Sequence, residues 1–119
     1  MEGVLLDPGQ LARVAAEAAS DKKASDVLLL DIREVTAFAD YFVICSGSNR
    51  RQLQAIADAI DEQLSAQGAH LFHREGDSDT GWLLLDFGDI IVHILGSKER
   101  EYYDLERLWN GAKTVVYLQ

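Results

Sequence analysis

The residues best suited to bind an anion lie in the segment 45–52, which reads CSGSNRRQ. This segment follows an apolar run and opens a helical pattern, a geometry that directs backbone N–H groups and the positive end of a helix dipole toward one point. The glycine spacing fits neither a Walker loop nor GxGxxG, and small polar residues are needed at such a turn for chain reversal and capping alone. We therefore favour a structural role for the Gly47-Ser48 turn and keep phosphate or nucleotide binding as the alternative.

Two carboxylates near that turn, Asp86 and Asp89, are candidates for two-metal nucleotidyl transfer. Such chemistry needs carboxylates that converge, commonly two residues apart on one strand. Here the spacing is three residues, Asp89 falls in a predicted turn, and successive strand residues point to opposite faces. Asp58 and Asp61 are expected as solvated charges on a helix. These spacings argue against a catalytic metal centre.

His93 is the candidate general base, because Asp86 occupies a diagonal position on the same face of a predicted hairpin and could orient its imidazole. The nucleophile would come from the nearby small residues Cys45, Ser46 and Ser48. A hydrogen-bonded histidine on a half-buried sheet face is the commoner arrangement, so we favour a structural His93. His70 and His73 lack a third ligand at useful spacing, which gives a zinc site little support. We predict no enzymatic activity and no cofactor.

The composition describes a small acidic protein of 119 residues with 48% hydrophobic residues and a formal net charge of −9. This length fits one domain over residues 1–119. The single cysteine excludes an internal disulfide framework and favours a reducing cytosol, and neither a secretion signal nor a membrane span is apparent. The negative charge repels phosphate backbones, so we expect no direct sequence-specific nucleic-acid binding and a basic protein as partner. Acidity that serves only solubility is the alternative interpretation.

Local signals predict a mixed α/β fold of about five strands flanked by helices. Asp7, Pro8 and Gln10 mark a capped helix start, and Asn49 with Gln52 marks a second, which ends at Gly68. The apolar positions of this second helix are Leu53, Ile56, Ala57, Ile60 and Leu64. The predicted strands are Val27 to Ile32, buried on both faces, Tyr41 to Ser46, Ala69 to Arg74, Trp82 to Phe87 and Ile90 to Leu95. Residues 33–40 are a connection, 75–81 a loop, and the tail TVVYL either an edge strand or a packed segment.

The last two strands flank Gly88-Asp89, which is typical of a two-residue hairpin with glycine at the first turn position. This turn pairs Leu85 with Val92 and Leu83 with Ile94 on a face that should be pure core. The opposite face then carries a mixed set of side chains, namely Trp82, Leu84, Asp86, Ile91, His93 and Leu95.

A final helix from Ser97 to Trp109 is expected to complete a binding surface beside that mixed face. Projected at ~100° per residue, its core arc of roughly 120° contains Leu108, Leu105, Trp109 and Tyr102. Tyr103 and a solvated Glu106 would then stand beside Trp82 and Asp86, forming an aromatic patch rimmed by carboxylates. Such patches are typical of protein interfaces, although aromatic residues can also simply seal a small core.

Three segments in this order resemble the ribosomal silencing factor family, RsfS or Iojap-like: YFVICSGSNRRQLQAIAD, GWLLLDFGDIIVHIL and EREYYDLERLW. The resemblance runs from about Ala12 to Trp109. It implies a fold similar to the nucleotidyltransferase core without its catalytic carboxylates. It also implies a cytoplasmic repressor that binds the fourteenth protein of the large ribosomal subunit and hinders subunit joining when nutrients are scarce.

The family's partner-binding surface maps onto the WLLLD strand and the YYDLERLW helix. The resemblance thus assigns partner binding to Trp82, Asp86, Tyr102, Tyr103, Asp104, Leu105, Glu106 and Trp109. The chain departs from the family pattern at Gly47-Ser48-Asn49, Phe87 and Gly96, outside those positions. Because an exposed apolar patch often pairs with itself, a homodimer of the isolated protein is also expected.

Overall fold

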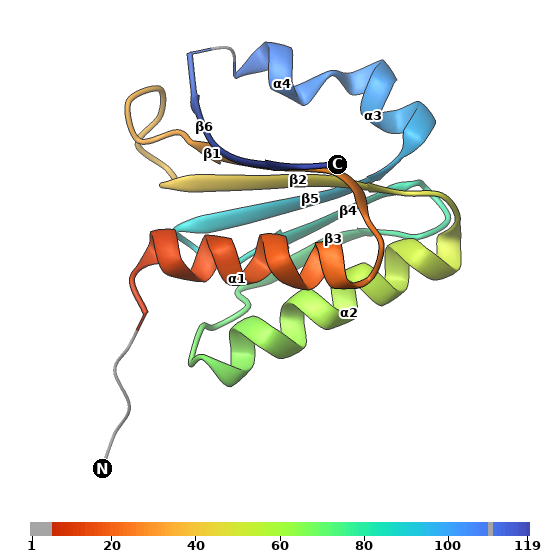
Figure 1. Ribbon diagram of the computed structural model, residues 1–119, viewed down its shortest axis with the longest axis horizontal. Helices are drawn as coiled ribbons and strands as arrows, with labels where there is room; N and C mark the ends of the chain where they lie inside the picture. The colour runs from red at the N-terminus through yellow and green to blue at the C-terminus, as the bar shows by residue number, and fades with distance from the viewer. Residues whose placement is uncertain (1–5, 110) are drawn as a thin grey trace.

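A mixed sheet separates two layers of helices in the computed structural model, which describes residues 6–109 and 111–119. Helices α1 (Pro8–Asp21) and α2 (Arg50–Ala66) cover one face, and α3 (Ser97–Tyr103) and α4 (Leu105–Leu108) cover the other (Figure 1). The strands are β1 (Ser25–Asp31), β2 (Tyr41–Gly47), β3 (His73–Asp77), β4 (Trp82–Asp86), β5 (Ile90–Gly96) and β6 (Lys113–Leu118). The predicted α/β class is confirmed, with six strands in place of about five.

The sheet has the order β3-β4-β5-β2-β1-β6, and β2 and β5 form its parallel pair, in register from Tyr41 opposite Ile90 to Gly47 opposite Gly96. Both strands therefore end at the same edge of the sheet. From there β2 leads into α2 on one face, whereas β5 leads into α3 on the other (Figure 1). In open α/β sheets such a divergence creates a crevice where ligands often bind.

Burial on both faces of β1 is confirmed. Val27 and Leu29 belong to the core beneath α1 and α2, whereas Leu30 and Ile32 belong to a second core beneath α3 and α4. A strand covered on both sides needs apolar residues at consecutive positions, which is why its sequence does not alternate.

The predicted helix starts are also confirmed. Asp7 and Gln10 form a reciprocal capping box, in which the Gln10 amide donates to Asp7 Oδ1 at 2.8 Å and the Asp7 amide donates to Gln10 Oε1 at 3.0 Å. Asn49 Oδ1 accepts a bond of 2.8 Å from the Gln52 amide. Beyond α2, Gly68 has a φ of 88°, the left-handed conformation expected of a helix stop. None of the helices in the described residues is long and apolar enough to span a membrane.

The hairpin register matches the prediction. Leu83 pairs with Ile94 and Leu85 with Val92, and these residues lie in the core beneath α1 and α2. Gly88 has a φ of 88°, as the tight turn requires.

The strand predicted over Ala69 to Arg74 is displaced. Strand β3 begins at His73 and takes in Glu75, Gly76 and Asp77, which the sequence had suggested to be loop. These polar residues can join the sheet because β3 is an edge strand whose side chains are all exposed. Charged side chains on an edge also discourage pairing with other chains.

The single C-terminal helix predicted from Ser97 to Trp109 is broken. Asp104 takes a left-handed conformation, with a φ of 47°, between α3 and α4. The tail then forms β6, antiparallel to β1, so the edge-strand alternative is the correct one.

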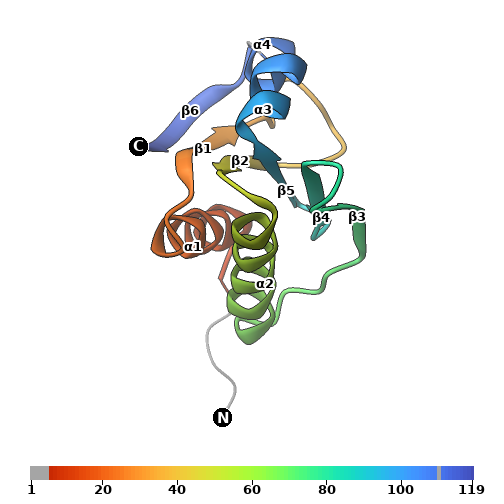
Figure 2. The ribbon, with the colours of Figure 1, turned by 90° about the vertical axis from the view of Figure 1, so that its right-hand side faces the viewer.

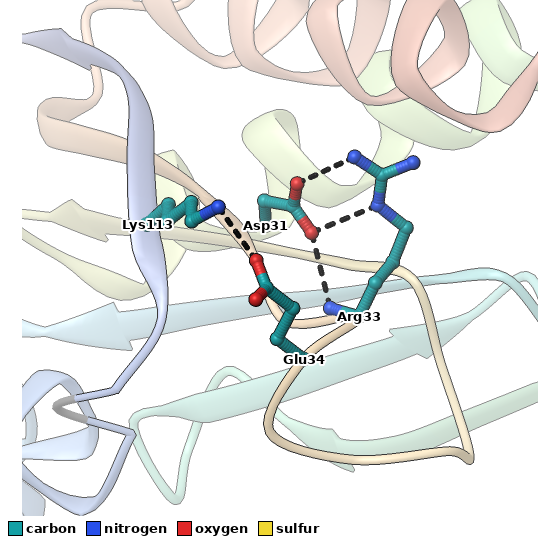
Figure 3. Close-up of polar contacts among 4 residues, drawn as sticks. All are labelled: Asp31, Arg33, Glu34 and Lys113. Atoms are coloured by element: carbon teal, nitrogen blue, oxygen red, sulfur yellow. Dashed lines mark hydrogen bonds and ion pairs between the residues drawn. The ribbon is translucent and has the colours of Figure 1, made fainter.

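Two ion pairs involve the connection after β1 (Figure 3): one joins it to the end of β1 and the other to the start of β6. Arg33 donates to Asp31 through Nε at 3.0 Å and Nη2 at 2.7 Å, while Lys113 Nζ lies 2.6 Å from Glu34 Oε2. The hydrogen bonds from Arg33 lower the pKa of Asp31 to about 2. The carboxylate therefore stays ionised over the ordinary pH range.

Candidate functional site

The Gly47-Ser48 turn is filled by a side chain of the protein itself. Gln52 Oε1 accepts bonds from the Ser48 amide at 2.6 Å and from Ser48 Oγ at 2.9 Å. Gln52 Nε2 in turn donates to the carbonyls of Lys22, at 3.2 Å, and Lys23, at 2.9 Å. Because the Gln52 amide group already satisfies the Ser48 amide that an anion would need, the geometry supports the structural interpretation of this turn.

Neither small residue at the end of β2 is placed as a nucleophile. Cys45 is fully buried, and desolvation raises the pKa of its thiol to about 12, so the reactive thiolate does not form near neutral pH. Ser46 is also buried, and its Oγ accepts a bond of 3.0 Å from Arg100 Nη1.

His93 is held by an aromatic side chain and not by a carboxylate. Trp82 Nε1 donates to His93 Nδ1 at 3.3 Å, and the Phe42 ring lies edge-on with its centroid 5.0 Å from the imidazole. Burial lowers the pKa of His93 to about 4, so the ring is neutral at pH 7. Asp86 Oδ1 instead accepts a bond of 2.7 Å from the Gly88 amide. The favoured structural role of His93 fits these contacts, and the alternative, a dyad of Asp86 with His93, is absent from the contacts of the described residues.

No group of three or more His, Cys, Asp or Glu side chains within residues 6–109 and 111–119 is arranged to hold a metal ion. Asp89 lies at the hairpin turn, where its backbone carbonyl accepts bonds from the amides of Asp40, at 2.8 Å, and Tyr41, at 3.0 Å. Of the two residues considered for nucleotidyl transfer, Asp86 thus contributes to the hairpin turn through its carboxylate, and Asp89 contributes through its backbone carbonyl.

An exposed aromatic hollow lies between β4 and the end of α3. The rings of Trp82 and Tyr103 pack with centroids 4.5 Å apart, and Tyr102 meets Tyr103 edge-on at 5.0 Å. The hollow has a volume of about 360 Å³ and is lined by Glu75, Gly76, Thr80, Trp82, Leu84 and Tyr103. Tyr103 is 44% exposed, so its side chain is partly open to solvent although its ring packs against Trp82. The predicted contact between Trp82 and Tyr103 is confirmed.

Arg100 fixes the segment that carries Tyr103. Its Nε donates to Glu106 Oε2 at 3.0 Å, and its Nη1 donates to the Asp26 carbonyl at 2.8 Å and to Ser46 Oγ at 3.0 Å. One guanidinium therefore joins α3 to α4 across the left-handed Asp104, and joins both to the strands beneath.

Two positions on this segment differ from the helical projection. Tyr102 was placed in the core arc but is 82% exposed, because the left-handed Asp104 breaks the helix and Tyr102 no longer shares a face with Leu105 and Trp109. Glu106 was expected to be solvated, but it is half-buried against Arg100, and its Oε1 is enclosed without a hydrogen-bond partner.

Leu105 and Trp109 lie in or against the second core, as projected. Leu105 is buried, and the half-buried Trp109 packs edge-on against Phe42, with ring centroids 5.0 Å apart. The side chain of Leu108, the remaining residue of the projected arc, lies outside the described part of the chain. Trp82, Tyr102 and Tyr103 are therefore the aromatic residues of the predicted set that face the hollow or solvent.

Sequence reasoning missed Glu75, Gly76, Thr80 and Leu84 as walls of the hollow. The first three stand in a segment whose polar composition predicted a loop, so no local signal placed them beside Trp82. Leu84 carried a usable signal, because its alternation with Leu83 and Leu85 already assigned it to the face that carries Trp82.

The fold and the site together define a small α/β domain that presents an aromatic hollow and whose catalytic candidates are engaged in structural contacts. Residues 6–118 match the family described as "Ribosomal silencing factor during starvation". The Ribosomal silencing factor RsfS of Bacillus subtilis is 42% identical over 102 residues, which cover 86% of each chain. The chain belongs to the ribosomal silencing factor family, as the sequence motifs indicated.

Two further comparisons agree with this assignment. A crystal structure of a Chromobacterium violaceum protein superposes with a TM-score of 0.85 at 31% identity, covering 93% of this chain and 94% of that one. The mouse protein named "Mitochondrial assembly of ribosomal large subunit protein 1" is 29% identical over 115 residues, which cover 87% of this chain and 50% of that protein.

Proposed function

We propose that this protein binds the large ribosomal subunit through its fourteenth ribosomal protein and sterically blocks association with the small subunit. In this way it represses translation in the cytoplasm when nutrients are limiting, without catalysing a reaction. Family membership supports the ribosomal setting, and the name of the mouse relative refers to the large subunit.

The observation that carries this proposal is the Trp82–Tyr103 hollow. Paired, partly exposed aromatic rings give a large contact area at low entropic cost, because few side-chain torsions must be ordered on binding. The Arg100 contacts hold α3 and α4 in place before a partner arrives, which reduces the ordering cost of association. Trp82 and Tyr103 are the proposed anchors.

Charge complementarity favours a basic partner. The chain has a formal net charge of −9, and the exposed Glu75 lies in the wall of the hollow. Carboxylates at the rim of an interface mainly accelerate encounter and fix orientation. We propose this role for Glu75, Asp86 and Asp104, and a smaller one for Glu106, whose charge is already paired with Arg100.

Sedimentation of purified ribosomal subunits tests the proposal directly. Added wild-type protein should shift the particles toward separate subunits and should itself sediment with the large one. Tyr103→Ala should weaken binding by about 30-fold, the equivalent of about 2 kcal/mol for an interface hot spot. Phe72→Ala is the matched control, because Phe72 is an exposed aromatic residue outside the lining of the hollow. Unchanged subunit joining in the presence of wild-type protein would refute the proposal.

We further propose that the isolated protein pairs with a second copy through the same aromatic face. Trp82→Ala should then weaken both the dimer, measured by analytical ultracentrifugation, and binding to the large subunit. Loss of only one of the two interactions would show that they use different surfaces. Thermal melting checks that the variant remains folded, since Trp82 also bonds to His93.

A further inference from the structure

Four connections meet at one end of the sheet, the right-hand end in Figure 1 and the end that faces the viewer in Figure 2. They are the turn from α1 to β1, the turn from β2 to α2, the turn from β3 to β4, and the junction of β5 with α3. Residues far apart in the sequence are therefore neighbours here.

This end gathers exposed cationic side chains from three of the four connections, which we call the basic end: Lys22, Lys23, Arg50, Arg51 and Lys98. The Gln52 side chain joins the first turn of α2 to the carbonyls of Lys22 and Lys23. Arg50 and Lys98 line one hollow of about 350 Å³, and Arg50 and Arg51 line another beside it.

The cations of the basic end differ from most others in their pairing. In the described part of the chain, Arg33, Arg74, Arg100 and Lys113 each form an ion pair with a carboxylate. Within the basic end, Arg50 pairs with Asp79, whereas no such pair involves Lys22, Lys23, Arg51 or Lys98. The remaining cations without an ion pair among the described residues are Arg13 and Arg107. The described residues thus include six cations without an ion pair, and four of the six lie at the basic end of this acidic protein.

The basic end adjoins the aromatic hollow. A smaller hollow of about 290 Å³ is lined by Thr80, Lys98, Glu99, Tyr102 and Tyr103, so Lys98 stands between the aromatic rings and the Gly47-Ser48 turn. A surface that receives Tyr103 would therefore also come close to the basic end.

We propose that the basic end contacts the phosphate backbone of ribosomal RNA when the aromatic hollow is docked on its protein partner; this inference rests on the proposed function. Exposed Lys and Arg side chains from several turns suit phosphate contacts that do not depend on sequence. The net charge of −9 and the nearby Asp79 and Glu99 keep the free protein from binding RNA strongly. Docking of the aromatic hollow overcomes this repulsion, because it holds the basic end close to the RNA. For two contacts joined by a short connection, the effective concentration of the second reaches the millimolar range.

The test compares binding to intact large subunits with binding to the purified fourteenth ribosomal protein, each over a series of salt concentrations. The variant is Lys22→Gln/Lys98→Gln. Its control, Arg13→Gln/Lys113→Gln, removes the same charge from exposed positions on α1 and β6. The basic-end variant should bind subunits more weakly than the control. Its plot of log affinity against log salt should be shallower by about 0.7 to 0.9 for each phosphate that the variant no longer neutralises. Binding to the purified ribosomal protein should be equal for the two variants.

Two outcomes would overturn the inference. Equal affinity of both variants for the subunit would mean that the basic end does not touch it. If the basic-end variant also bound the purified ribosomal protein more weakly than the control did, and by the same factor as for the subunit, the basic end would bind protein and not RNA. Failure of the wild type to bind either target would instead refute the proposed function itself.

Discussion

His93 couples the stability of the fold to pH, because its imidazole is buried in the neutral form. The pKa of this side chain falls from 6.5 to about 4 on burial. The unfolded chain therefore takes up a proton below pH 6.5, whereas the native protein does so only near pH 4. The full stabilisation associated with the neutral His93 is therefore present above pH 6.5, and it is lost as the pH falls from 6.5 to about 4.

The gap between the two pKa values corresponds to about 3 kcal/mol of unfolding free energy, at ~1.4 kcal/mol per pH unit. Urea unfolding of the wild type at intervals from pH 7 to pH 4 should show this loss, added to that from carboxylates. Between pH 5 and 6, the unfolding free energy of His93→Leu should fall less steeply than that of the wild type, by up to ~1.4 kcal/mol per pH unit. The reason is that the variant has no imidazole to protonate. Its lower overall stability, from the unpaired Trp82 indole, does not affect the slope.

His70→Leu is the control, because His70 is exposed before β3 and should leave the slope of the wild type unchanged. Proton NMR of the imidazole C–H resonances reports the pKa of His93 directly. An identical slope for wild type and His93→Leu, or a His93 resonance that titrates near pH 6.5, would refute the account of the buried ring.

The remaining predictions concern the Arg100 contacts, the thiol and one glycine. Arg100→Met should lower the unfolding free energy in urea by roughly 1 to 3 kcal/mol, because the variant leaves Glu106 half-buried without its partner; an unchanged midpoint would contradict this role. Cys45 should resist iodoacetamide in the native protein and react in urea, as mass spectrometry would show, and rapid native labelling would exclude a buried thiol. Gly76→Ala should lower the melting temperature, since Gly76 has a φ of 76° and an added Cβ would meet the Trp82 carbonyl; wild-type melting would show that β3 can shift without cost.

The elements that sequence alone predicted well are those whose signals are local. Helix α2 has an Asn49 cap, a regular apolar stripe and the Gly68 stop within one continuous segment. The β4–β5 hairpin follows from alternation around Gly88-Asp89, which also defined the two faces of these strands. The family assignment rested on motifs that include these same elements, and the comparisons confirm it.

The sequence predicted part of the candidate site, but the contact between Trp82 and Tyr103 was predicted from a continuous helix that the structure does not have. A continuous helix placed Tyr103 beside Trp82, and the two rings do meet, but the helix ends there and exposes Tyr102. Helical projection assumes equal turns between residues, so the left-handed Asp104 breaks the angular relation between Tyr102 and the core residues Leu105 and Trp109 that follow it.

The sequence by itself therefore determined the layers and the hairpin register, because caps, turns and apolar periodicity act over a few residues. The family was indicated separately, by the resemblance of its motifs. Only the tertiary structure decided how the aromatic hollow is closed and held. Arg100 binds the Asp26 carbonyl across 74 positions of the chain, and Glu75 and Gly76 line the hollow with Trp82 only because polar residues can occupy an edge strand. Such contacts depend on the packing of distant segments, which local periodicity does not encode.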